Sequence, residues 1–146
     1  MNKKQNFQWN HMTMGVCYYP EHWPESIWLE DLERMKEAGI STVRVAEFAW
    51  SLIEPEEGTF CFGFFDRFLD LCEKKDMKVI MGTPTATPPA WLTEKYPEVL
   101  NADRNGILLR HGCRRHYNYN SAVYQRLCSR IVEQMASHYG PHPAVC

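Results

Sequence analysis

The residues best suited to chemistry in this 146-residue chain follow three short segments rich in strand-forming residues. Glu21 and His22 follow the first segment, Glu47 and Trp50 follow the second, and Arg114 lies in a longer stretch after the third. Each group mixes aromatic rings with hydrogen-bonding side chains. A pyranose offers apolar C–H faces to aromatic rings and a rim of hydroxyls to Arg, Asn and carboxylates. The pattern therefore favours a sugar-binding site.

Two glutamates are candidates for acid–base work on a sugar. Cleavage of a glycosidic bond needs two carboxyl groups that flank the bond, about 5–5.5 Å apart in retaining enzymes. Glu21 and Glu47 are the candidates here, because both follow predicted strands. Glu47 ends a segment suited to burial, where a carboxylate needs a partner. Two interpretations stay open: Glu47 lines a site, or it forms a structural ion pair with Arg44. Glu21 and Glu56 are also compatible with ordinary surface positions.

The elements that must position these side chains follow from hydrophobic periodicity and from Pro and Gly positions. We predict strands over 12–19, 42–48 and 78–82, helices over 24–38, 64–75 and 121–139, and loops over 50–63 and 83–119. Gly39 is expected to cap the first helix in a left-handed conformation. Alternating strands and helices indicate an α/β fold with a parallel sheet. Ligands bind such sheets at the carboxyl ends of the strands.

Composition excludes several classes of protein. The formal net charge is −2, which argues against a nucleic-acid footprint or electrostatic membrane binding. No apolar run approaches the roughly 18 residues of a membrane span. The N-terminal lysines are not followed by an apolar stretch, so we expect no secretory signal and a cytoplasmic location. Residues 1–11 are predicted to be a flexible arm, and 12–146 a single domain.

Cysteine and histidine spacing gives no metal motif. The six cysteines contain no C-x-x-C pair and the six histidines no H-E-x-x-H motif. Cys113 and His116 are close in sequence, but two ligands do not make a site. We predict neither disulfides nor a metal held by these residues alone. Cys72, Trp28 and Phe65 occupy helical apolar positions and are expected to be buried.

Four stretches resemble the family 42 glycoside hydrolases, the β-galactosidases. They are GVCYYPEHWP (15–24), VRVAEFAWSLIEPEEGTF (43–60), GTPTATPPAWL (82–92) and RRHYNYNSAVY (114–124). The resemblance implies the first three βα units of an eight-stranded (β/α) barrel, which is incomplete because a whole barrel needs about 200–250 residues. It also implies a retaining enzyme that cleaves terminal β-D-galactosyl residues, homotrimeric at full length.

The resemblance assigns residues one by one. Arg114 matches the family arginine that binds galactose, and Tyr18, Glu47 and Trp50 match positions near the sugar. In the family, the acid/base glutamate comes shortly after a stretch like His-Pro-Ala-Val, which is 142–145 here. We therefore expect the acid/base and the nucleophile beyond Cys146, no catalytic residue among these 146, and no hydrolysis by this chain alone. The alternative is a non-catalytic carbohydrate-binding remnant.

The resemblance also bears on cofactors and partners. The family requires no cofactor, but many members bind zinc through a cysteine that directly follows Arg-Arg-His-Tyr. That position is Asn118 here, and an amide does not replace a thiolate as a zinc ligand. The expected partner is a β-galactoside, with no nucleic acid and no membrane.

Overall fold

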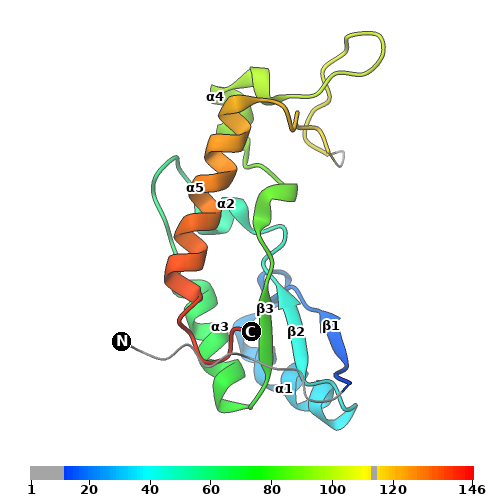
Figure 1. Ribbon diagram of the computed structural model, residues 1–146. Helices are drawn as coiled ribbons and strands as arrows, with labels where there is room; N and C mark the ends of the chain where they lie inside the picture. The colour runs from blue at the N-terminus through cyan, green and yellow to red at the C-terminus, as the bar shows by residue number, and fades with distance from the viewer. Residues whose placement is uncertain (1–11, 113–114) are drawn as a thin grey trace.

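Three short strands form a parallel sheet in the order β1-β2-β3 in the computed structural model, which describes residues 12–112 and 115–146 (Figure 1). They are β1 (Gly15–Cys17), β2 (Thr42–Val45) and β3 (Lys78–Met81). Val43 of β2 lies opposite Val16 and Val79. This confirms the predicted α/β class and parallel sheet. All three strands are shorter than predicted, and β2 stops because Ala46 has a positive φ of 71°.

Three long helices lie where the periodicity predicts them. They are α1 (Glu25–Glu37), α3 (Gly63–Lys74) and α5 (Ala122–Tyr139). Gly39 has a φ of 80° after α1, which confirms the predicted left-handed end of that helix. Ser121 caps α5, because its side-chain oxygen accepts a hydrogen bond from the backbone N–H of Tyr124.

The predicted loops over 50–63 and 83–119 were wrong in part, because both contain short helices. These are α2 (Trp50–Ile53) and α4 (Ala90–Lys95), and the second loop also contains the 3-10 turns η2 (Pro84–Ala86) and η3 (Pro97–Val99). A further 3-10 turn, η1 (Pro20–His22), lies between β1 and α1. Prolines that flank such elements restrict the backbone without preventing a turn of helix, since the first helical N–H groups have no partner within the helix. Elements this short carry too few periodic positions to be recognised.

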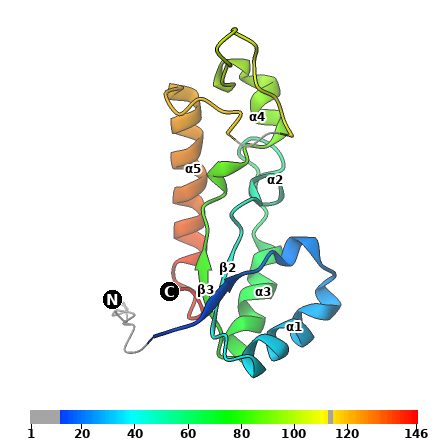
Figure 2. The ribbon, with the colours of Figure 1, turned by 90° about the vertical axis from the view of Figure 1, so that its right-hand side faces the viewer.

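The two faces of the sheet differ sharply. Val43, Val45 and Val79 are fully buried on the face covered by α1 and α3 (Figure 2), where they meet core residues that include Trp28, Leu32, Phe65, Phe68 and Cys72. The opposite face carries Arg44 and Ile80, which are exposed and opposite each other in the β2–β3 register. A groove of about 250 Å³ crosses this second face. Neighbouring residues of a strand reach opposite faces of the sheet because successive side chains alternate in direction.

Residues 144–146 continue the sheet beside β3. The N–H of Val79 donates to the carbonyl of Ala144 at 2.8 Å, and the N–H of Cys146 donates to the carbonyl of Val79 at 3.1 Å. Val79 and Val145 form a parallel bridge. Helix α5 runs alongside β3 in both views (Figures 1 and 2) and returns the chain to the start of this pairing. Among the described helices, none is long and apolar enough to cross a membrane.

Candidate functional site

Glu47 lies at the carboxyl end of β2, in an ion pair with Arg44 of the same strand. Nη2 of Arg44 donates to Oε2 of Glu47 at 2.5 Å, and the hydroxyl of Tyr19 donates to the same oxygen at 3.4 Å. The Glu47 side chain is 26% exposed and that of Arg44 47%. The left-handed turn at Ala46 directs Glu47 toward this pair. Both predicted interpretations of Glu47 remain compatible with the geometry, because it is paired and still partly accessible.

The end of β3 approaches the same carboxylate. A Cβ at Gly82 would lie 2.7 Å from Cγ of Glu47 and 2.9 Å from the carbonyl oxygen of Val45. Only glycine fits this position without displacing Glu47. We call Tyr19, Arg44, Glu47 and Gly82 the strand-end cluster, since they bring together the carboxyl ends of all three strands.

Aromatic rings border the strand-end cluster on one side. The ring of Tyr19 lies 5.5 Å from the rings of both His22 and Phe48. Partial burial, together with the negative charge of Glu47, raises the pKa of the Tyr19 phenol. The hydrogen bond to Glu47 raises the pKa of Arg44. At neutral pH the cluster therefore presents a neutral phenol, a guanidinium and a paired carboxylate, groups that suit hydroxyl recognition.

Tyr18 lies on the other side of β1. Its hydroxyl donates to Oδ2 of Asp31 at 2.7 Å, and its ring stacks on Phe68 at 5.7 Å between centroids. Tyr18 is only 7% exposed, and burial raises its pKa. The structure thus brings Glu47 together with Tyr19 instead. Both tyrosines come after the last residue of β1, so the strand pattern does not separate them.

Trp50 and Arg114 complete the predicted substrate-binding set. Trp50 is fully buried, and its indole N–H donates to Oε2 of Glu54 at 2.8 Å, so its contacts here are with the core. Arg114 lies outside the described residues. Sugar contact by either residue stays a prediction.

Glu21 follows β1 in the turn η1. Both of its carboxylate oxygens are enclosed, with no hydrogen-bond partner among the described residues. Burial raises the pKa of this carboxyl group. Glu56, in contrast, is exposed, as its predicted surface position requires.

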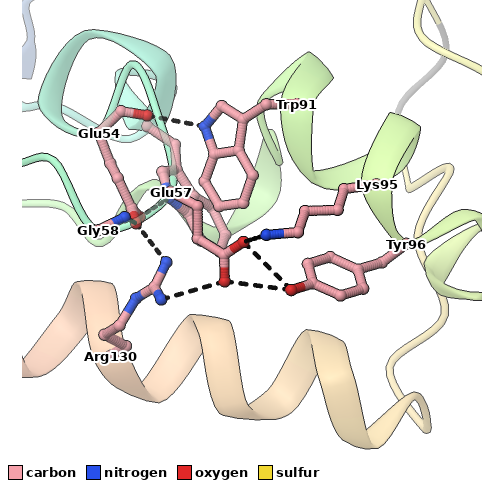
Figure 3. Close-up of polar contacts among 8 residues, drawn as sticks. Glu54, Glu57, Gly58, Trp91, Lys95, Tyr96 and Arg130 are labelled. Carbon is pink, nitrogen blue, oxygen red and sulfur yellow. Dashed lines mark hydrogen bonds and ion pairs between the residues drawn. The ribbon is translucent and has the colours of Figure 1, made fainter.

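An ion-pair network around the buried Glu54, which sequence reasoning missed, lies outside the strand-end cluster (Figure 3). Glu54 is fully buried, and Oε1 accepts hydrogen bonds from Arg130 of α5 and, at 2.7 Å, from the backbone N–H of Gly58. The indole N–H of Trp91 in α4 donates to the carbonyl of Glu54 at 2.9 Å. Both carboxylate oxygens and the backbone carbonyl of Glu54 thus accept a hydrogen bond.

Glu57 extends this network to α4. Its carboxylate pairs with Lys95 at 2.5 Å and with Nη1 of Arg130 at 3.4 Å, and it accepts from the hydroxyl of Tyr96. The hydrogen bond from Lys95 holds the pKa of Glu57 below its usual range. We call Glu54, Glu57, Trp91, Lys95 and Arg130 the Glu54–Arg130 network. The charged residues are far apart in sequence, so no local pattern reveals their pairing.

One group of possible metal ligands occurs among the described residues, away from the strand ends. Asp70, Glu73 and His142 place one ligand atom each within 4.8 Å of one another. Nδ1 of His142 accepts the N–H of Ala144, and its Nε2 faces Oδ1 of Asp70 at 3.4 Å. This arrangement is that of a hydrogen-bonded cluster. Asn118, at which the resemblance led us to expect no zinc ligand, accepts the N–H of Asn120 through its amide oxygen.

Known proteins resemble this chain closely. A curated β-galactosidase of Thermus thermophilus is 52% identical over 132 residues, which are 90% of this chain and 20% of the relative. The solved β-galactosidase of the psychrophilic Marinomonas ef1 has a TM-score of 0.87 at 50% identity and covers 92% of this chain. The solved enzyme of Halorubrum lacusprofundi has a TM-score of 0.87 at 44% identity. The chain spans about a fifth of the length of these relatives.

The family profile gives the same result. Residues 17–146 match the glycoside hydrolase 42 profile, which is described as beta-galactosidase. The match includes the carboxyl ends of all three strands and the whole Glu54–Arg130 network. The chain therefore belongs to the glycoside hydrolase 42 family.

Proposed function

We propose that this chain supplies the first part of the galactose site of a retaining β-galactosidase. The observation that carries the proposal is the family match over residues 17–146, together with relatives named as β-galactosidases. In this proposal the sheet is formed by the first three of eight βα units, and the substrate is a terminal β-D-galactosyl residue. The homotrimer expected of the full-length protein belongs to the same proposal.

Within the strand-end cluster, the proposed role of Glu47 is to accept hydrogen bonds from sugar hydroxyls. Its pairing with Arg44 fixes the carboxylate, and its partial exposure leaves lone pairs accessible to a ligand. Tyr19 joins it as a second hydroxyl-binding group. Arg114 remains the proposed galactose-binding arginine. Tyr18 and Trp50 remain in the proposed set through the motifs they belong to, and their burial suits a supporting role.

The proposal places neither the acid/base nor the nucleophile among these 146 residues. Retaining hydrolysis needs two carboxyl groups on either side of one bond. Glu47 is paired with a guanidinium, and the proposal gives it a binding role. We therefore expect this chain alone to bind galactose without cleaving galactosides. A non-catalytic carbohydrate-binding role is the second candidate, since binding by the strand-end cluster needs no second carboxyl group.

The test measures sugar binding and hydrolysis by the purified chain. Titration calorimetry with galactose is expected to show saturable binding, with glucose as the comparison sugar, and nitrophenyl β-galactoside is expected to remain uncleaved. Glu47→Gln should weaken galactose binding about tenfold, the loss expected when a hydrogen bond to a charged group is weakened. Glu56→Gln is the matched control and should leave the affinity unchanged, because Glu56 is exposed outside the cluster. A folded chain that does not bind galactose would overturn the proposal.

A further inference from the structure

The Glu54–Arg130 network joins three segments that lie far apart in the sequence. The loop after β2 contributes Glu54 and Glu57, α4 contributes Trp91 and Lys95, and α5 contributes Arg130 (Figure 3). Arg130 is the shared member, because its guanidinium reaches both glutamates. Arg130 therefore ties the loop after β2 to α5, and α4 joins the same loop through Lys95 and Trp91.

The burial of Glu54 restricts the directions from which its hydrogen-bond donors can approach. Removing a carboxylate from water is costly, and apolar packing of similar volume often stabilises a protein as well as a buried ion pair does. A buried pair differs from apolar packing in its directionality, since each donor must point at a chosen oxygen. Glu54 receives the indole of Trp50 on Oε2, and Gly58 and Arg130 on Oε1. Each of these three donors therefore has one defined position around the carboxylate.

A continuous set of contacts leads from this carboxylate to Glu47. Trp50, held by Glu54, begins α2, and the N–H of Ile53 donates to the carbonyl of Ala49 at 3.0 Å. The N–H of Ala49 in turn donates to the carbonyl of Ala46 at 3.1 Å. Ala46 is the left-handed residue immediately before Glu47. The position of Trp50 thus limits the turn that presents Glu47.

We propose that Arg130 is a positioning residue for Glu47, acting through Glu54 and Trp50, and that it anchors the loop after β2 to α5. The inference rests on the proposed function, in which Glu47 contacts galactose. Arg130 itself does not belong to the strand-end cluster. Its effect on the sugar is through geometry, because it orients the carboxylate that holds Trp50.

The test compares Arg130→Met with Arg130→Lys and with Arg126→Met, an exposed arginine on the same helix. The readouts are the NMR signals of the Glu47 carboxyl carbon and of the Trp50 and Trp91 indole N–H groups, followed by galactose affinity. Arg130→Met should shift all three signals and weaken galactose binding at least fivefold. Arg130→Lys should restore part of both effects, and Arg126→Met should change neither.

A second variant separates a loss of positioning from a loss of folding. Arg130→Met leaves Glu54 without its guanidinium, so the double variant Arg130→Met, Glu54→Gln removes both charges and should show the same shift of the Glu47 signal. An unchanged Glu47 signal in a folded variant would overturn the inference, whatever the sugar result. Lowered stability with unchanged galactose affinity would also overturn it. Absence of galactose binding in the unmodified chain, with the Glu47 signal still shifted by Arg130→Met, would instead reject the proposed function and retain the structural coupling.

Discussion

Gly82 is the residue on which the position of Glu47 depends most directly. A methyl group at this position would lie 2.7 Å from Cγ of Glu47 and 2.9 Å from the carbonyl of Val45, and the backbone carbonyl cannot move out of its way. We predict that Gly82→Ala lowers the free energy of unfolding by about 1–3 kcal/mol, the usual cost of overpacking. Urea unfolding measures this change.

The control for this substitution is Gly63→Ala. A Cβ at Gly63 would meet only Nη1 of Arg67 at 3.7 Å, an ordinary contact, and the residue begins α3. This variant should be neutral or slightly stabilising, because alanine favours a helix more than glycine does. Equal effects of the two substitutions would show that steric pressure at Gly82 is not the cause.

Which residues are buried or paired could be predicted better than the direction in which each side chain points. Trp28, Phe65 and Cys72 are buried as their helical spacing predicts, and the Arg44–Glu47 pair was one of two stated interpretations. Motif position drew attention to Tyr18, whereas Tyr19 contacts Glu47. A strand of three residues offers too little alternation to fix which of two adjacent side chains faces the site.

At the scale of elements, the loop after β2 and the helix α4 are coupled through a titrating group. The pKa of Glu57 in the folded chain is lowered by its hydrogen bond from Lys95. A carboxyl group whose folded pKa lies below its unfolded value stabilises the fold above the unfolded pKa, near 4.3 for glutamate, and this stabilisation disappears as the pH falls through the folded value.

We therefore predict a pH-dependent effect of Glu57→Gln. Its melting temperature should lie below that of the unmodified chain at pH 7, and the difference should shrink on acidification to about pH 3. Thermal melts followed by circular dichroism at both pH values measure the difference. Glu56→Gln, at the exposed neighbouring position, should show no such trend. A difference in melting temperature that grows toward acid pH would contradict the lowered pKa of Glu57.

The long helices followed from the sequence because each has enough periodic positions to reveal its buried face, and the strands followed from their strand-forming residues. Helices α2 and α4 did not, since they have four and six residues and lie among prolines. The Glu54–Arg130 network was also beyond sequence reasoning. Its ion pair joins residues 76 apart in sequence, and only the folded path of α5 brings them together.

At the scale of the whole molecule, the sheet has one covered and one uncovered face. Ile80 is 39% exposed on the uncovered face, and its neighbour Val79 is fully buried on the other. An exposed apolar side chain beside the groove promotes self-association. We predict that Ile80→Lys reduces self-association, measured by sedimentation velocity, without lowering the melting temperature. Val79→Lys should unfold the chain, because it would bury an unpaired charge. Unfolding by both substitutions would contradict this account of the two faces.

The order of the sheet has a consequence for how the protein is made. Strand β2 pairs with β1, β3 pairs with β2, and residues 144–146 pair with β3, so each strand joins the one that precedes it in the sequence. Each pairing closes a loop of modest length, which keeps its entropy cost small. A ribosome releases the chain in this same order, and N-terminal parts fold first during synthesis. Every new strand therefore emerges when its partner is already in place, and the sheet grows at one edge as translation proceeds.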